Sequence, residues 1–269
     1  MGRKFVISDL HGQFVLLQLL LEKIHFTDED ELFILGDIMD RGPNSIDIYY
    51  FVKEMPNIYM IKGNHEIMMR QALAQSLKYD DLDDPRNNAF RLWKQNGGYK
   101  TVNSIREFLQ KDAIAYSEYF DNRRTFIKEI IAFIDSLPNY FEFTFQGTHY
   151  VLVHAGVDPE AKGPADTDPE LLCWIREYFY LSECDPHITY IFGHTPLCFI
   201  NEDGSFNVWY DPDYHNKIGI DGGLAVADKG QLNCLCLNDG SVTVLPYEMG
   251  QMEAIDARVL EDHKKIYGM

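Results

Sequence analysis

The sequence predicts an α/β fold with two β-sheets, and three observations support this prediction. The first third alternates short apolar runs with amphipathic segments at helical spacing. The segment from about 70 to 140 changes to interrupted helical periodicity. Strand-like runs return after Phe141 and include the hairpin signal Asn238-Asp239-Gly240. With 269 residues and 46% hydrophobic content, the chain fits one domain over 1–269 with a helical insertion at about 70–140.

The first third is predicted to hold three strands separated by helices. Short, continuous apolar strands with helices between them are typical of a parallel sheet whose faces are both covered. In such sheets the functional loops gather beyond the carboxyl ends of the strands. In chain order we expect the strand KFVIS (4–8), the helix Gln13–Ile24, the strand LFILG (32–36), the helix Ser45–Lys53, the strand IYMIK (58–62) and a helix opening near Asn64.

The insertion is expected to lie over the strand ends. It contains the acidic patch DDLDDP (80–85) and the segment WKQNGGY (93–99), which either shape substrate choice or simply connect helices. The charged tail after Gly250 is expected to be a terminal helix or a frayed end. Between them we expect a second sheet of more antiparallel character, formed by YVLVHAG (150–156), ITYIFGHTP (188–196), NVWYD (207–211), KIGIDGG (217–223), LNCLCLND (232–239) and SVTVLPYE (241–248).

Composition argues against several classes of partner. Lys and Arg total 24 against 42 Asp and Glu, so a net charge of -18 disfavours nucleic acid and anionic membrane surfaces. The longest apolar run, residues 14–24, is interrupted by Gln18 and Glu22, and the start of the sequence lacks the apolar core of a signal peptide. We therefore expect a cytoplasmic protein without a membrane span. The oligomeric state stays open.

The five cysteines are an odd number without a zinc-finger pair, which favours ordinary reduced thiols over a metal or redox site. No loop combines Cys and Arg in the way that a covalent phosphocysteine mechanism requires. Any phosphatase chemistry is therefore expected to be of another type.

Polar side chains gather in five short motifs that each follow a predicted strand: SDLHG, GDIMDRG, GNHE, LVHAG and FGHTP. Carboxylates, imidazoles and an amide oxygen are ligands for divalent transition metals such as Mn, Fe and Zn. A two-metal centre explains why so many are needed, because one carboxylate can bridge two ions. The residues that would meet at the strand ends are Asp9, His11, Asp37, Asp40, Arg41, Asn64, His65, His154 and His194.

Each motif alone also has an ordinary structural explanation. Asn64 could cap the helix that follows it, and His154 and His194 could be hydrogen-bonded core histidines. Asp37 and Asp40 with Arg41 are harder to explain in this way, because charges at a buried strand end are costly unless they have partners. The order and common placement of all five motifs favour the metal centre.

In these motifs, from Asp9 to about Gly223, the chain resembles the phosphoprotein phosphatases of the metallophosphoesterase (calcineurin-like) superfamily. One departure is Ser8, where the family often has Gly. The resemblance implies a four-layer α/β/β/α sandwich of two mixed β-sheets flanked by helices. It also implies two divalent or trivalent metal ions, with Mn preferred over Fe or Zn. Asp9 and His11 would hold the first ion, and Asp37 would bridge the two. The second ion would be held by Asn64, His154 and His194.

The resemblance implies separate roles for the remaining residues. His65 would protonate the leaving oxygen as a general acid, and Asp40 would orient its imidazole. Arg41 and Arg176, the latter from a Trp-x-Arg segment, would clamp the phosphoryl oxygens. Without the family, Arg176 could be a charge on a helix surface. Glu66 is expected to support the site through hydrogen bonds.

The function implied is a metal-dependent phosphomonoesterase that dephosphorylates phosphoproteins or phosphopeptides on Ser or Thr, with Tyr left open. The expected mechanism is direct attack by a hydroxide held between the two metals. The alternative is a symmetrical dinucleoside tetraphosphatase, although such enzymes typically lack the second Asp of GDxxDRG and carry Asp after the Asn-His pair. A remote alternative is a non-catalytic metal-binding scaffold. The WxxNGG segment also resembles bacterial and phage-type members of the family.

Overall fold

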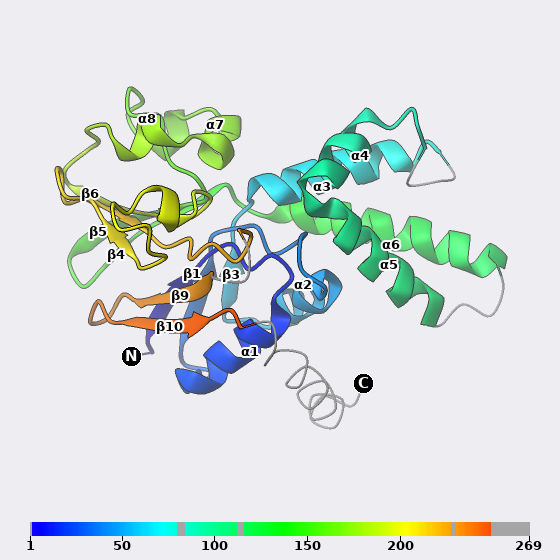
Figure 1. Ribbon diagram of the computed structural model, residues 1–269, viewed down its shortest axis with the longest axis horizontal. Helices are drawn as coiled ribbons and strands as arrows, with labels where there is room; N and C mark the ends of the chain where they lie inside the picture. Colours follow the sequence, from blue (N-terminus) through cyan, green and yellow to red (C-terminus); the bar gives the residue numbers. More distant parts are fainter. Residues whose placement is uncertain (1, 80–83, 112–115, 227–229, 249–269) are drawn as a thin grey trace.

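The computed structural model describes residues 2–79, 84–111, 116–226 and 230–248. Within these ranges two five-stranded β-sheets pack against each other, and helices lie on their outer sides (Figure 1). This arrangement confirms the predicted α/β/β/α sandwich of two mixed sheets. The predicted tail after Gly250 and residues 80–83 of the acidic patch lie outside the described residues.

The first sheet consists of β1 (Lys4–Ile7), β2 (Glu31–Ile34), β3 (Ile58–Met60), β9 (Gln231–Cys236) and β10 (Val242–Pro246). Its strand order is β10-β9-β1-β2-β3. The strands β1, β2 and β3 run parallel to one another, as predicted, and β9 and β10 form the antiparallel hairpin predicted from Asn238-Asp239-Gly240.

The assignment of this hairpin to the second sheet is wrong, because β9 pairs with β1 and places Leu235 opposite Val6. Cys234 faces the core beneath the helices, whereas its neighbour Leu235 faces the core between the sheets. Both faces of β9 thus contribute to an apolar core, although Asn233 is also buried on the face of Leu235. Such a strand could occupy the interior of either sheet, so its sequence alone does not identify the sheet that it joins.

The second sheet has the strand order β4-β5-β6-β8-β7 and is mixed. Its three inner strands are parallel, whereas β4 and β7 pair antiparallel at the two edges. The strands are β4 (Tyr140–Phe145), β5 (Thr148–Val153), β6 (Ile188–Phe192), β7 (Trp209–Tyr210) and β8 (Lys217–Gly219).

Alternation along the strands produces the layers. In β1, Val6 faces the core between the sheets together with Leu152 and Ile191 of the second sheet. Its neighbours Phe5 and Ile7 face the helices on the other side. Because both faces of the first sheet are covered, its strands are continuous apolar runs rather than alternating ones.

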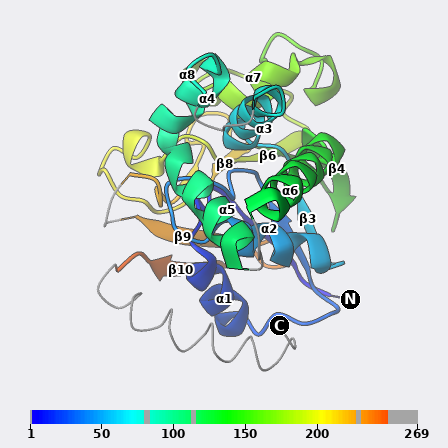
Figure 2. The same cartoon turned by 90° about the vertical axis from the view of Figure 1, so that its right-hand side faces the viewer.

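The helices divide between the outer faces. The helices α1, α2, α3 and α6 lie on the side of the first sheet, whereas the short helices α7 and α8 cover the second sheet (Figure 2). No helix within the described residues is long and apolar enough to cross a membrane. The helices are α1 (Phe14–Lys23), α2 (Ser45–Glu54), α3 (Asn64–Ser76), α4 (Asn88–Trp93), α5 (Tyr99–Lys111), α6 (Tyr116–Ser136), α7 (Pro169–Trp174) and α8 (Glu177–Tyr180), with shorter turns at η1 (Lys94–Gly98), η2 (Pro164–Asp166) and η3 (Leu197–Phe199).

The helical insertion is formed by the end of α3 together with α4, η1, α5 and α6. It extends to one side of the sandwich beyond α7, on the right of Figure 1. Contacts between α3 and α6 and between α2 and α5 attach it to the rest of the molecule. The insertion therefore borders the same ends of the strands at which the sequence motifs lie.

Candidate metal centre and catalytic site

The five motifs meet at the carboxyl ends of parallel strands. They follow β1, β2 and β3 of the first sheet and β5 and β6 of the second. A cavity of about 270 Å³ opens at this point. Of the ten predicted site residues, Asp40 and His154 lie buried behind its wall, and the other eight line it: Asp9, His11, Asp37, Arg41, Asn64, His65, Arg176 and His194.

Asp37 occupies the centre of this cluster. Its Oδ2 lies 3.9 Å from His11 Nε2 and 3.6 Å from His154 Nε2. The other ring nitrogen of each histidine lies against a backbone carbonyl, with His11 Nδ1 3.0 Å from Met39 O and His154 Nδ1 2.6 Å from Leu35 O. These nitrogens must donate, so both Nε2 atoms present lone pairs towards the Asp37 carboxylate.

Asn64 continues the same pattern. Its Oδ1 lies 2.9 Å from His154 Nε2 and 3.0 Å from His194 Nδ1. His194 Nε2 is buried and has no hydrogen-bond partner among the described residues. The alternative role of Asn64 as a helix cap is excluded, because Gly63 is the N-cap of α3 and Asn64 is its first helical residue.

His154 Nε2 thus faces two acceptor oxygens, Asn64 Oδ1 and Asp37 Oδ2, without a proton of its own, and such a group of acceptors fits a bound cation. Two groups of three side chains, both of which include Asp37, have ligand atoms close enough to hold an ion: His11, Asp37 and His65, and Asp37, His154 and His194. In the chain alone, burial raises the pKa of Asp37, with Glu66 and Asp9 adding to the rise, and burial lowers the pKa of His11. Divalent cations would reverse the effect on Asp37 by favouring the carboxylate, and they would reinforce the effect on His11 by favouring the neutral imidazole.

His65 and Asp40 form a buried pair beside this centre. His65 Nδ1 lies 2.7 Å from Asp40 Oδ2. Trp93 Nε1 donates to the same carboxylate oxygen over 2.7 Å, and Thr101 Oγ1 donates to Oδ1 over 2.6 Å. Burial raises the pKa of Asp40 to about 7 against the opposing effect of these donors, and burial and Arg41 lower the pKa of His65 to about 3.

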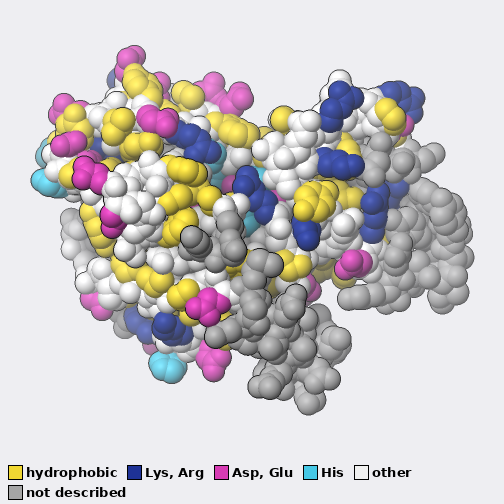
Figure 3. Space-filling view, in the orientation of Figure 1, with side chains coloured by type: hydrophobic (Ala, Val, Ile, Leu, Met, Phe, Trp, Pro, Cys, Tyr) yellow, Lys and Arg dark blue, Asp and Glu magenta, His cyan; other side chains and the backbone are white. Residues whose placement is uncertain are grey.

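Both arginines reach the cavity. Arg176 lies in the break between α7 and α8, where Nη1 donates to Thr195 Oγ1 over 3.1 Å and to His194 O over 3.3 Å. The other explanation considered for Arg176, a charge on a helix surface, does not describe this position. Arg41 is exposed, and its Nη2 lies 3.4 Å from His65 Nε2. Figure 3 shows Lys or Arg side chains next to His in the hollow at the centre of the molecule.

Glu66 connects two of the motifs. One carboxylate oxygen accepts hydrogen bonds from the backbone N–H groups of Asp37 (2.8 Å) and Gly63 (2.9 Å), and the other accepts from Ile38 N–H (3.0 Å). All four residues are buried. Three backbone donors are thus satisfied by one side chain, which fixes the loop after β2 against the start of α3.

Positive φ angles concentrate at the site. Among the described residues other than glycine, nine have φ above zero, and six of these are predicted site residues: Asp9, His11, Asp37, Asp40, Arg41 and His194. Such angles are uncommon outside glycine and occur at functional sites, where the surrounding structure holds them. The turns at the strand ends therefore adopt a strained backbone that directs these side chains into one place.

The insertion contributes to the site in a way that neither interpretation of WKQNGGY anticipated. Gly97 O accepts a hydrogen bond from Arg41 N–H over 3.2 Å, and a Cβ at Gly97 would lie 2.6 Å from Arg41 Cγ. Trp93 and Thr101 hold Asp40, as described above. The segment thus positions Asp40 and Arg41 rather than merely connecting helices, and its Trp-x-x-x-Gly-Gly pattern was the available signal.

Asp221 is the other site residue that the sequence did not single out. It lines the cavity, is buried, and accepts a hydrogen bond from Gly223 N–H over 2.8 Å. Burial and the nearby Asp9 raise the pKa of its carboxyl group. Its signal was its position two residues after the end of β8 and directly before two glycines.

Curated proteins match part of this chain. The symmetrical bis(5'-nucleosyl)-tetraphosphatase of Erwinia tasmaniensis is 31% identical over 94 residues, which are 30% of this chain and 34% of that protein. The enzyme of the same name from Buchnera aphidicola is 36% identical over 89 residues, 32% of each chain. The chain therefore spans about a third of the length of these curated relatives.

Solved structures share the fold. The metallophosphoesterase from Sphaerobacter thermophilus superposes with a TM-score of 0.53 at 16% identity, covering 96% of this chain and 93% of that one. A protein serine/threonine phosphatase from Saccharomyces cerevisiae superposes with a TM-score of 0.50 at 15% identity, and the match covers 92% of this chain and 80% of that one. The family model for calcineurin-like phosphoesterases matches residues 3–226. The chain belongs to the calcineurin-like phosphoesterase family.

Proposed function

We propose that this metallophosphoesterase hydrolyses dinucleoside tetraphosphates symmetrically. The observation that supports a phosphate-cleaving function is that five of the six predicted metal ligands and both predicted arginines line one small cavity, with the sixth ligand, His154, buried behind its wall. The substrate class is carried over from the curated relatives, which are named symmetrical tetraphosphatases. These names favour the second of the two functions expected from the sequence over a phosphoprotein phosphatase.

The residues that would hold the metals are those that the resemblance implies. Asp9, His11 and Asp37 would hold one ion, and Asp37 with Asn64, His154 and His194 the other. Two bound divalent ions would supply an acidified water and neutralise phosphoryl oxygens. The ligand set suits Mn, Fe and Zn.

The remaining side chains act on the substrate directly. Arg41 and Arg176 reach the cavity from opposite parts of the chain and would bind the negative oxygens of the phosphoryl group under attack. His65 Nε2 faces the cavity and would deliver a proton to the leaving oxygen, while its Nδ1 stays hydrogen-bonded to Asp40. An anionic substrate would oppose the lowering effect of Arg41 on the pKa of His65.

The second candidate is the phosphoprotein phosphatase, and one observation favours it. The Asp40–His65 pair is complete and is held by Trp93 and Thr101. Proton donation matters most for a leaving group of high pKa, such as the alkoxide of serine, and less for a nucleoside diphosphate. A pair built with this many hydrogen bonds is useful for phosphoserine, although it does not prevent cleavage of a phosphoanhydride.

A parallel assay separates the two candidates. Chelated protein resupplied with Mn would be given diadenosine tetraphosphate and a phosphoserine peptide, and product release would be measured for each. We expect a larger kcat/KM for the dinucleotide, with ADP as the only nucleotide product. A larger kcat/KM for the peptide would overturn this proposal in favour of the second candidate. Turnover of neither substrate, with metals bound, would favour the non-catalytic scaffold.

A further inference from the structure

A second and larger hollow adjoins the metal centre. It has a volume of about 470 Å³ and lies among α3, α4, the end of α6 and α7; we call it the α3–α7 groove. Two chain segments contribute to both hollows. After β3, Lys62 lines the groove and Asn64 the catalytic cavity; after α7, Trp174 lines the groove and Arg176 the cavity.

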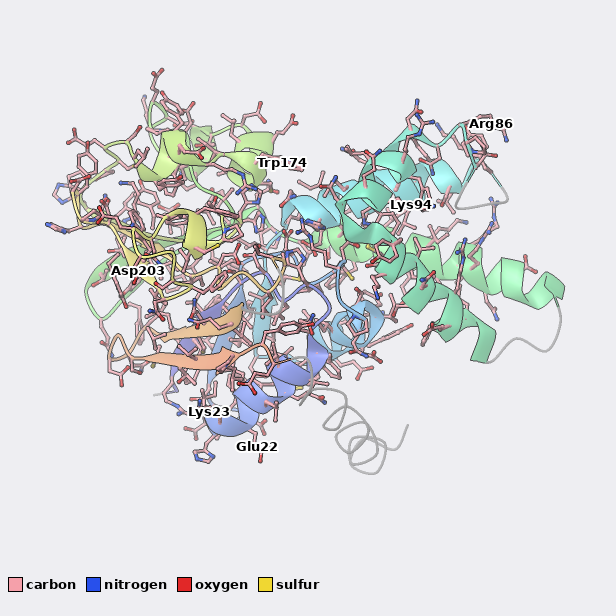
Figure 4. All side chains as sticks on the ribbon, viewed as in Figure 1. Glu22, Lys23, Arg86, Lys94, Trp174 and Asp203 are labelled. Carbon is pink, nitrogen blue, oxygen red and sulfur yellow. The ribbon has the colours of Figure 1, made fainter. Side chains whose placement is uncertain are left out.

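Trp174 lines the groove and contacts His194, which lines the catalytic cavity. Its ring packs edge to face against the ring of His194, with 5.9 Å between centroids. The side chain is nevertheless 38% exposed, and Figure 4 shows it at the end of α7, on the side towards α3 and α4. Leu92 of α4, which is 50% exposed, lines the same groove. Two large apolar side chains are thus available to a ligand next to a metal-ligating histidine.

The charges of the groove almost balance. Arg70 is paired with Asp135, with Nε to Oδ1 at 2.9 Å. Lys62 has no ion pair among the described residues, and Glu170 supplies one opposing charge. A nearly neutral groove with exposed apolar walls suits an uncharged, planar group better than additional phosphates. Lys62 lies two positions before Asn64, which lines the catalytic cavity, and it is the cation of the groove that a phosphate chain could contact.

The volumes of the two hollows also favour the groove as the place for a nucleoside. Pockets for drug-sized ligands occupy roughly 300–1,000 Å³. The catalytic cavity, at about 270 Å³, falls below this range, whereas the groove, at about 470 Å³, lies within it. A substrate with nucleosides at the ends of a phosphate chain must therefore place its nucleosides outside the catalytic cavity.

We infer that the α3–α7 groove binds one nucleoside of the substrate, with the base stacked on Trp174 and Lys62 beside the adjoining phosphate. This inference rests on the proposed dinucleotide substrate. Stacking of a base on an aromatic side chain is worth enough to change binding by about 5- to 150-fold. Phosphate compounds without a base would gain nothing from stacking on Trp174.

The test compares Trp174→Leu with Trp174→Phe, which keeps an aromatic face. For each protein, kcat/KM is measured with diadenosine tetraphosphate and with inorganic tripolyphosphate, which has no base. We expect Trp174→Leu to lower the ratio of the two values by about 5- to 150-fold, mainly through KM, and Trp174→Phe to restore most of it. Tyr178→Leu, which removes an exposed aromatic ring from α8, is the matched control and should leave the ratio unchanged.

A binding measurement on the metal-free protein gives an independent readout. The indole N–H signal of Trp174, assigned by its loss in Trp174→Phe, should shift on addition of ADP and not on addition of tripolyphosphate. If the wild-type protein does not cleave the dinucleotide, the proposed function fails. If it does cleave it, but Trp174→Leu leaves the ratio unchanged and ADP leaves the indole signal in place, the groove assignment fails while the function stands.

Discussion

Replacement of Trp93 by Phe should reveal how the insertion controls the Asp40–His65 pair. The change keeps a buried aromatic ring but removes the indole N–H that donates to Asp40 Oδ2 over 2.7 Å. Asp40 is fully buried, so no water can replace this donor without rearrangement. The lost hydrogen bond is one of the interactions that oppose the rise in the pKa of Asp40.

The size of the effect should depend on pH. Burial raises the pKa of Asp40 from 3.8 to about 7, so the folded chain holds a proton that the unfolded chain releases, and stability falls as pH rises through this range. At pH 5 the carboxyl group is neutral and the lost hydrogen bond should cost about 0.5–1.5 kcal/mol. At pH 8 it is a carboxylate, and the cost should rise to about 1.5–3 kcal/mol.

Urea unfolding of the metal-free protein at both pH values measures this difference. Trp209→Phe is the matched control, because the Trp209 ring packs against Tyr180 and Phe192 and its indole N–H makes no hydrogen bond among the described residues. We expect the control to lose the same stability at pH 5 and pH 8. An equal loss at the two pH values for Trp93→Phe would show that the indole N–H does not stabilise the charged form of Asp40.

Three further substitutions test other parts of the site. Asp37→Asn should abolish turnover and lower the bound metal measured by plasma mass spectrometry, since it removes the shared charge; full metal content with full activity would contradict its bridging role. His65→Asn should keep the metals but reduce phosphoserine turnover more than p-nitrophenyl phosphate turnover, because the latter leaving group needs little protonation; equal losses would indicate a positioning role. Glu66→Gln should reduce the free energy of unfolding by about 1–3 kcal/mol, because an amide cannot accept from all three backbone N–H groups. An unfolding curve identical to the wild type would contradict that account.

Local pattern was sufficient to predict the first half of the fold. The parallel strands β1, β2 and β3 and the helices between them follow from apolar runs whose period and length are set within each segment. The position of β9 was not predictable in this way. Its alternate residues, Cys234 and Leu235, face two different apolar cores, so pairing with β1 depends on contacts far along the chain.

The candidate site, too, was predictable where local sequence determines it and not where it depends on distant contacts. The motif residues could be predicted to meet because the carboxyl ends of parallel strands share one edge. The hydrogen bonds from Trp93 and Thr101 to Asp40 could not, because they join residues 53 and 61 positions apart across an insertion of unpredicted orientation. Asp221 had a visible signal, namely its position after a strand and before two glycines, but its motif did not match the five others.

The strained turns limit which residues can replace the predicted metal ligands, even in a related protein that no longer binds metal. A left-handed backbone is tolerated best by glycine, then by asparagine and aspartate, whatever the side chain does. A descendant that no longer binds metal would thus still be expected to keep one of these three residues at positions 9, 37 and 40, because β-branched or bulky replacements would destabilise the turns. Aspartates at these three positions therefore do not by themselves demonstrate catalysis, whereas His65 and Arg176, which do not have positive φ angles, are the more informative residues to inspect.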